Sequence, residues 1–154
     1  MNLNILSEMK KIVPLLLLMP VMALAQWNFG GEKVVKVEAF RSNKQVMVNL
    51  FPKKGYGVQK KAPNKVILYK LKPGHHKAKT VKEKVRLFGK HVGTVTRFRG
   101  KTAKEDKKYF SRVNSLIFRQ QDFSKGDYIL ESRLYYCSFK DGFCSVQASK
   151  QQVL

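Results

Sequence analysis

Short stretches of alternating apolar and polar residues recur along this chain. In one of them Val46, Val48 and Leu50 occupy every second position, as a strand with one buried face requires. Valine, isoleucine and aromatic residues, which favour strands, are frequent in the other stretches as well. The pattern predicts eight strands, at Lys33–Phe40, Gln45–Phe51, Lys65–Lys72, Val81–Phe88, His91–Phe98, Tyr109–Arg119, Asp127–Phe139 and Phe143–Leu154.

Turn-forming residues separate the predicted strands. Examples are Pro52 with Gly55, Pro63, and the pair Asp141-Gly142. Only Lys101–Tyr109 has a composition that favours a helix, and because it has no apolar stripe we expect a charged loop there. Eight short strands with turns between them in about 130 residues predict an all-β fold, namely an immunoglobulin-like antiparallel β-sandwich.

Residues 1–25 have the layout of a secretory signal peptide. Lys10 and Lys11 precede a short apolar run, and the small-residue site Ala23-Leu24-Ala25 follows it. The run is shorter than the roughly 20 residues that a membrane-spanning helix needs. We therefore expect cleavage after Ala25, a single domain over residues 26–154 without a transmembrane segment, and a periplasmic or secreted location. A retained signal anchor is the alternative.

The predicted domain is strongly basic. The chain has 31 Lys and Arg residues against 10 Asp and Glu residues, and only Lys10, Lys11 and Glu8 of these lie in the predicted leader. A large positive charge favours polyanions at low salt, among them anionic envelope polymers. The lysines are dispersed along the chain, which is more typical of a solvated surface than of a specific site.

The sequence gives little indication of a metal site, a cofactor site or a nucleic-acid-binding surface. His75 and His76 are adjacent, and on a strand-like backbone their side chains would point to opposite sides, so we predict no metal site and no cofactor. Arg97-Phe98-Arg99 and Phe118-Arg119 interleave aromatic and basic residues, as single-strand nucleic-acid binders do. The predicted export argues against a nucleic-acid partner.

The two cysteines, Cys137 and Cys144, lie close together near the end of the sequence. In an oxidising compartment such a pair forms a disulfide. Because their separation is odd, a hairpin with the four-residue loop 139–142 can place them directly opposite each other, with Gly142 in a left-handed conformation. A bridge that closes so short a loop stabilises the fold by roughly 2 to 3 kcal/mol at most, which slightly favours a chemical role over a structural one.

Alternation assigns the two cysteines to different faces of the predicted hairpin. Cys137 shares its face with Arg133 and is predicted to point outward, whereas Cys144 shares its face with Val146 and is predicted to point inward. A β-bulge would reconcile the two assignments.

Aromatic residues crowd the hairpin and can either shield the sulfurs or form ordinary sandwich core. Core packing is favoured for Tyr136. Shielding is favoured for Phe139 and Phe143, which lie in or beside the predicted turn.

Two stretches of the sequence resemble a known family. Tyr136-Cys137 followed by Asp141-Gly142-Phe143-Cys144 is similar to the cysteine hairpin in the N-terminal periplasmic domain of the thiol:disulfide interchange protein DsbD. Phe51-Pro52-Lys53-Lys54-Gly55-Tyr56 and Ala62-Pro63-Asn64-Lys65-Val66 resemble a second segment of that domain family. The resemblance implies an immunoglobulin-like sandwich whose terminal hairpin passes reducing equivalents to periplasmic partners.

Two functions therefore fit the sequence. In the first, Cys137 and Cys144 are catalytic and exchange disulfides with envelope thiol or disulfide proteins, after reduction by another protein such as a membrane thiol transporter. In the second, the protein is a non-catalytic basic module that binds envelope components, and its disulfide is only structural.

Overall fold

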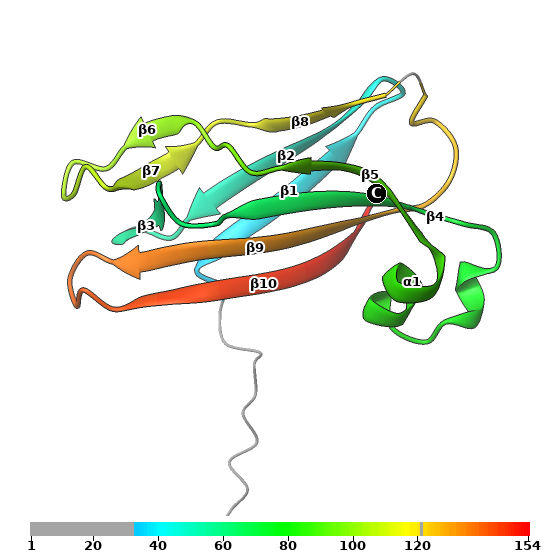
Figure 1. Cartoon of the computed structure of the whole chain (residues 1–154). Helices are drawn as coiled ribbons and strands as arrows, with labels where there is room; N and C mark the ends of the chain where they lie inside the picture. The colour runs from blue at the N-terminus through cyan, green and yellow to red at the C-terminus, as the bar shows by residue number, and fades with distance from the viewer. Residues whose placement is uncertain (1–32, 121) are drawn as a thin grey trace, which may run out of the picture. The chain divides into compact units, whose positions relative to one another are not determined.

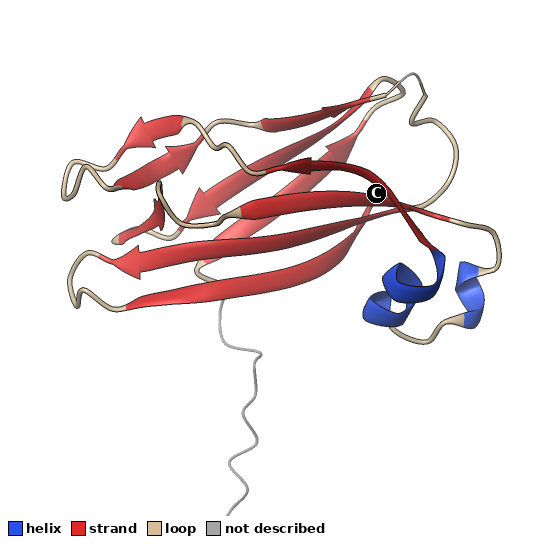
Figure 2. Ribbon diagram, in the orientation of Figure 1, coloured by secondary structure: helices blue, strands red, loops and turns tan. Residues whose placement is uncertain are grey.

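The computed structural model describes residues 33–120 and 122–154, which form two antiparallel sheets and one short α-helix (Figures 1 and 2). The predicted signal peptide lies outside the described residues. Within the described part of the chain, no helix is both long enough and apolar enough to cross a membrane.

The smaller sheet has three strands and the larger sheet has seven. The smaller sheet has the order β1 (Val35–Arg41), β2 (Gln45–Pro52) and β8 (Leu116–Arg119). The larger sheet has the order β5 (Gly89–Val95), β4 (Lys65–Leu71), β9 (Tyr128–Ser138), β3 (Tyr56–Gln59), β7 (Tyr109–Val113) and β6 (Gly100–Thr102), with β10 (Cys144–Val153) paired to β9. The long strand β9 pairs with β4 along its first half and with β3 along its last residues.

The hydrophobic core lies between the two sheets and is built from alternate residues of the strands. Val46, Val48 and Leu50 of β2 are almost completely buried, as their alternation predicts. The larger sheet contributes Leu130 and Leu134 of β9 to the same core, and both side chains are at most 1 % exposed. The prediction of an all-β antiparallel sandwich is confirmed, although the described residues contain ten strands rather than eight.

The prediction of a strand at Val81–Phe88 is wrong, because this segment is helix α1 (Val81–Phe88). The Thr80 side chain accepts a hydrogen bond from the Glu83 N–H at 3.1 Å, and the Glu83 carboxylate accepts one from the Lys79 N–H. This is close to a capping box, which satisfies amide groups that the first helical turn leaves unpaired. A short three-residue helix, η1 (His75–Lys77), precedes α1.

Two further strand predictions need correction. The stretch Tyr109–Arg119 is not one strand, since β7 belongs to the larger sheet and β8 to the smaller one, with Asn114 and Ser115 at the crossing between them. The turn residues around Gly55 are followed by β3, which sequence alternation did not predict because it is only four residues long. The charged loop predicted at Lys101–Tyr109 begins after β6, so it is shorter than expected.

Strand β10 closes the side of the sandwich with glutamine side chains. The Gln147 amide donates to the Val35 carbonyl at 2.6 Å and accepts from the Val35 N–H at 3.0 Å, so it pairs with β1 as a neighbouring strand would. The Gln151 amide donates to the Val37 carbonyl two residues further along. These bonds occupy backbone groups at the edge of β1 that would otherwise be open to another chain.

Candidate functional site

The predicted cysteine hairpin is formed by β9 and β10, at the end of the sandwich opposite to α1 (Figure 1). The Ser138 N–H donates to the Phe143 carbonyl and the Gly142 N–H to the Ser138 carbonyl, which closes the four-residue loop 139–142. Gly142 has a φ of 64°, in the left-handed region that glycine adopts without steric cost. The Ser138 hydroxyl donates to the Asp141 carboxylate and accepts from the Asp141 N–H, which fixes the turn from inside.

Cys137 and Cys144 form a disulfide across this hairpin, as the sequence predicts. They are directly paired in the register of β9 and β10, with Cα atoms 4.0 Å apart. The register continues without a shift from this pair to Tyr128 and Val153 at the other end of the hairpin. The bridge therefore needs no bulge.

The two cysteines differ strongly in exposure, and the buried one is the residue that was predicted to point outward. Cys137 is only 2 % exposed, whereas Cys144 is an exposed residue. Both side chains project from the outward face of the sheet, and the inward positions of β10 up to Gln151 are polar residues such as Gln147. The prediction for Cys144 is wrong because Gln147 and Gln151 of β10 face inward and bond to the backbone of β1, which leaves the apolar Val146 and Cys144 on the outward face.

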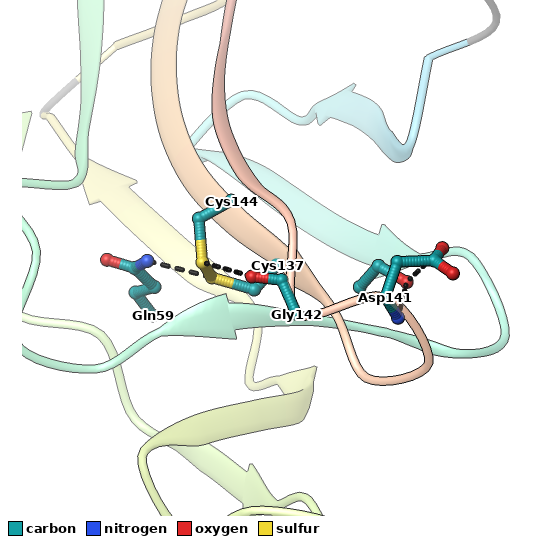
Figure 3. The surroundings of a disulfide bond; sticks show 6 residues. Gln59, Cys137, Asp141, Gly142 and Cys144 are labelled. Atoms are coloured by element: carbon teal, nitrogen blue, oxygen red, sulfur yellow. Dashed lines mark hydrogen bonds between the residues drawn. A yellow bond between two sulfur atoms is a disulfide. The ribbon is translucent and has the colours of Figure 1, made fainter.

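Strand β3 supplies a hydrogen-bond donor to the buried sulfur. The Gln59 Nε2 donates to the Cys137 Sγ at 2.8 Å, and Figure 3 shows the Gln59 amide directed at the disulfide. The Cys144 Sγ lies 3.7 Å from the Gly142 carbonyl oxygen. The side chain of Gln59 thus contacts one sulfur of the bridge, and the other sulfur belongs to the exposed residue Cys144.

Gly57 makes room for aromatic residues next to the buried cysteine. It lies directly opposite Cys137 in the register of β3 and β9, on the same outward face. A Cβ atom at Gly57 would lie 2.6 Å from the Phe139 ring and 2.7 Å from the Tyr109 Cβ, so only glycine fits under these side chains. Phe139 and Tyr109 pack edge to face with ring centroids 5.8 Å apart.

The predicted shielding residues occupy different environments. Phe139 is half-buried beside Cys137, in a position that suits a shield. Phe143 is 64 % exposed and, like Val146 at 42 %, leaves an apolar side chain on the surface next to Cys144. Tyr136 packs against the core from the inward face of β9, as predicted.

A buried asparagine connects this site to the neighbouring strands. Asn64, 3 % exposed, accepts a hydrogen bond from the Tyr135 N–H at 2.8 Å at the point where β9 passes from β4 to β3. Its amide also donates to the Gln59 carbonyl at 2.6 Å. Asn64 therefore holds the end of β3, and with it Gln59, in place against β9.

Within the part of the chain that the structure describes, the adjacent histidines do not form part of a metal site. His75 and His76 belong to the short helix η1 and not to a strand, which corrects the backbone assumed for them. The His75 Nε2 lies 2.9 Å from an Asp127 carboxylate oxygen, and its Nδ1 lies 3.1 Å from the Lys72 carbonyl. Among the described residues there is no group of three or more His, Cys, Asp or Glu side chains placed to hold a metal ion.

Comparisons with known proteins give no relative for this chain. No protein-family model, no curated protein and no solved structure matches it. The resemblance to the DsbD domain therefore stays a prediction. Both stretches that carry it nevertheless lie side by side, since Tyr56 pairs with Ser138 and the Phe139 N–H donates to the Gly55 carbonyl.

Sequence reasoning did not find Gln59, Gly57 or Tyr109 as parts of the site. The signal that could have suggested Gly57 is a glycine between β-favouring residues, since such a position often marks a close approach of another chain segment. Nothing in the sequence indicates that Gln59 contacts a cysteine 78 positions away.

Proposed function

We propose that this protein is an exported thiol–disulfide exchange domain that passes reducing equivalents to envelope proteins through Cys137 and Cys144. The observation that carries the proposal is the asymmetry of the bridge. One sulfur belongs to the exposed Cys144, and the other, of the buried Cys137, receives a hydrogen bond from the Gln59 amide. Exchange needs one sulfur that a partner can reach and one that can leave as a stabilised thiolate.

The asymmetry assigns the two cysteines different roles in the reaction. In the reduced domain the Cys144 thiolate attacks a sulfur of the partner's disulfide, which forms a mixed disulfide and releases one partner thiolate. The Cys137 thiolate then attacks the Cys144 Sγ, which restores the bridge and releases the second partner thiolate. Two electrons pass from the domain to the partner in these two steps. A dithiol of another protein, such as a membrane thiol transporter, reduces the bridge again by attack at Cys144.

Gln59 acts on the sulfur that leaves when the bridge is opened. A hydrogen bond to an anionic acceptor is roughly twice as strong as one between neutral groups. The Gln59 N–H therefore stabilises the Cys137 thiolate more than it stabilises the sulfur in the disulfide. Since a better-stabilised thiolate leaves faster, the same contact accelerates opening of the bridge.

A redox titration with thiol alkylation tests the proposal. The bridge should become reduced while the protein stays folded, and its reduction potential should lie above about −300 mV. Structural disulfides of secreted proteins usually have reduction potentials below that value. A bridge that resists reduction until the protein unfolds would contradict an exchange function.

Single-cysteine variants test the assigned roles. The Cys137→Ser variant keeps the exposed Cys144 and should form a mixed disulfide with an aromatic disulfide reagent at least about tenfold faster than Cys144→Ser, because thiol access limits the rate. Gln59→Leu should slow reduction of the wild-type bridge about tenfold, which corresponds to about 1.4 kcal/mol. Equal reaction of the two single-cysteine variants would refute the assignment.

The alternative function is a non-catalytic basic module that binds anionic envelope material. The supporting observation is the large positive net charge of the chain, +21 at pH 7. In that case the double variant Cys137→Ala/Cys144→Ala should fold and retain binding, and the affinity should fall steeply as salt rises. Absence of binding at low salt would remove this alternative.

A further inference from the structure

A pocket of about 610 Å³ lies beside the disulfide on the outward face of the larger sheet. Its volume is within the range of about 300 to 1,000 Å³ that is usual for ligand pockets. Residues of the end of β3, the β3–β4 loop, the β6–β7 loop, the start of β7 and β9 line it: Gln59, Lys60, Lys61, Ala62, Pro63, Lys107, Lys108, Tyr109 and Tyr135.

The uncharged part of the lining, here called the floor, combines aromatic and small apolar side chains. Tyr109 and Tyr135 come from β7 and β9, and Ala62 and Pro63 come from the β3–β4 loop. Asn64 anchors that loop by its hydrogen bonds to the Gln59 carbonyl and the Tyr135 N–H. The floor is therefore fixed by the fold and suits an apolar side chain of a ligand.

The charged part of the lining, here called the rim, consists of lysines from two loops. Lys60 and Lys61 lie on one loop and Lys107 and Lys108 on the other, and the Lys60 N–H joins the loops by donating to the Lys108 carbonyl at 3.0 Å. The Lys60 ammonium is held by the Thr102 hydroxyl. None of the described residues that line the pocket is acidic, and the other three lysines are exposed.

The pocket and the disulfide share residues. Gln59 lines the pocket with part of its surface and donates to the Cys137 Sγ with its amide. Tyr109 lines the pocket and packs against Phe139 of the cysteine turn. A peptide that rests in the pocket can therefore extend over β9 toward Cys144, which is paired with Cys137.

We propose that this pocket binds an acidic peptide segment of the redox partner, with an apolar side chain on the tyrosine floor and carboxylates at Lys61, Lys107 and Lys108. The inference rests on the proposed exchange function, because it places the partner's own cysteine next to Cys144. A peptide is favoured over a phosphate polymer because the apolar floor offers nothing to phosphate groups, whereas lysines for a polymer are available over the whole surface.

A binding measurement tests the pocket without any redox step. The probe is a labelled synthetic peptide of glutamates around one phenylalanine, with serine in place of cysteine, added to the oxidised protein and followed by fluorescence anisotropy. The triple variant Lys61→Glu/Lys107→Glu/Lys108→Glu should weaken its binding about tenfold or more. The matched variant Lys44→Glu/Lys72→Glu/Lys82→Glu has the same net charge but alters exposed lysines outside the pocket, and it should change binding less than about twofold.

Equal losses in the two triple variants would overturn the inference, because they would mean that only the overall charge attracts the peptide. Preferential binding of polyphosphate, with the same sensitivity to the pocket lysines, would also overturn it in favour of a phosphate polymer. A glutamate-to-lysine version of the peptide should not bind measurably to the wild type.

A kinetic measurement separates this inference from the proposed function. In the wild type, an acidic peptide with a cysteine should open the bridge about tenfold faster than the corresponding lysine peptide does. In the variant Lys61→Glu/Lys107→Glu/Lys108→Glu, the two peptides should open the bridge at nearly equal rates. Neutral dithiothreitol should reduce both proteins alike. If dithiothreitol reduces the folded protein but the peptides show no difference, the pocket inference fails alone. If the serine peptide binds but no thiol opens the bridge, the exchange function fails while the pocket still binds acidic peptide.

Discussion

The two ends of the β9–β10 hairpin are held in different ways. At the end away from the turn, Tyr128 and Val153 are buried in the core, and the Gln151 amide donates to the Val37 carbonyl of β1. At the turn, the disulfide connects the strands, but Phe143 and Cys144 are exposed. One end is thus anchored by packing and hydrogen bonds to both sheets, and the other end carries a covalent bond with little packing around its outer sulfur.

The difference indicates which contacts hold the hairpin in the fold. Removing a buried aliphatic side chain costs about 2 to 5 kcal/mol, whereas the bridge closes such a short loop that it contributes about 2.5 kcal/mol at most. The anchored end already places β9 and β10 without the bridge. We therefore expect the disulfide to open without unfolding the domain, as the proposed exchange reaction requires.

The largest effect should come from the inward face of the hairpin, which packs in the core between the sheets. Leu134→Ala removes a side chain that is fully buried between the sheets and should lower the free energy of unfolding by about 3 kcal/mol. Val146→Ala, on the outward face of β10, should lower it by less than about 0.5 kcal/mol. Urea unfolding of both variants measures the comparison, and similar losses would show that the two faces of the hairpin do not differ.

Opening the bridge should have the next largest effect. The double variant Cys137→Ala/Cys144→Ala should lose about 2 kcal/mol, consistent with the entropy of closing a short loop, and should remain folded. Circular dichroism and urea unfolding, with the oxidised and chemically reduced wild type as references, measure this loss. A double variant that is unfolded at room temperature would mean that the bridge and not the packed end holds the hairpin.

The glutamine contacts to β1 should have a smaller effect. Gln147→Leu removes the partner of both the Val35 N–H and the Val35 carbonyl and should cost about 1 to 2 kcal/mol. Hydrogen exchange of the Val35 amide should become faster at the same time. Gln152→Leu, at an exposed position of the same strand, is the control and should change neither quantity. Unchanged exchange at Val35 in the Gln147 variant would show that the edge of β1 is protected by other means.

The smallest effect concerns acid stability in the loop before β9. The Ser124 hydroxyl and N–H hold the pKa of the Asp122 carboxyl below its ordinary value of 3.8. Because the folded pKa is depressed, the stabilisation is present above the ordinary pKa and is lost as the pH falls through the lower folded value. Asp122→Asn should therefore flatten the dependence of Tm on pH slightly below pH 4 and leave the hairpin's redox behaviour unchanged. Superimposable Tm profiles of variant and wild type would contradict this.

The sequence carried enough information for the parts of the fold that depend on local pattern. Alternation in Gln45–Phe51 marks β2, and the odd spacing of the cysteines with Gly142 marks the disulfide hairpin. The helix at Val81–Phe88 was also readable, since Thr80 and Glu83 have the spacing of a capping box, but the valines favoured a strand instead. Short-range periodicity and capping involve neighbours in the chain, so they leave a signal in the sequence.

Other features depend on which segments meet in space. Cys144 lies on the outward face of β10 because the inward glutamines bond to β1, more than one hundred residues away in the sequence. The donor to Cys137 comes from Gln59, and the space for Phe139 comes from Gly57.

The sequence by itself determined an all-β chain with a basic surface and a terminal hairpin closed by Cys137 and Cys144. The tertiary structure decided which sulfur is buried, which side chain touches it, and where a lysine-rimmed pocket adjoins it. The physical reason is that the alternation of residues in a strand indicates only which side chains share a face of the sheet. Only the packing of the other strands decides whether that face is covered by core, by polar contacts or by solvent.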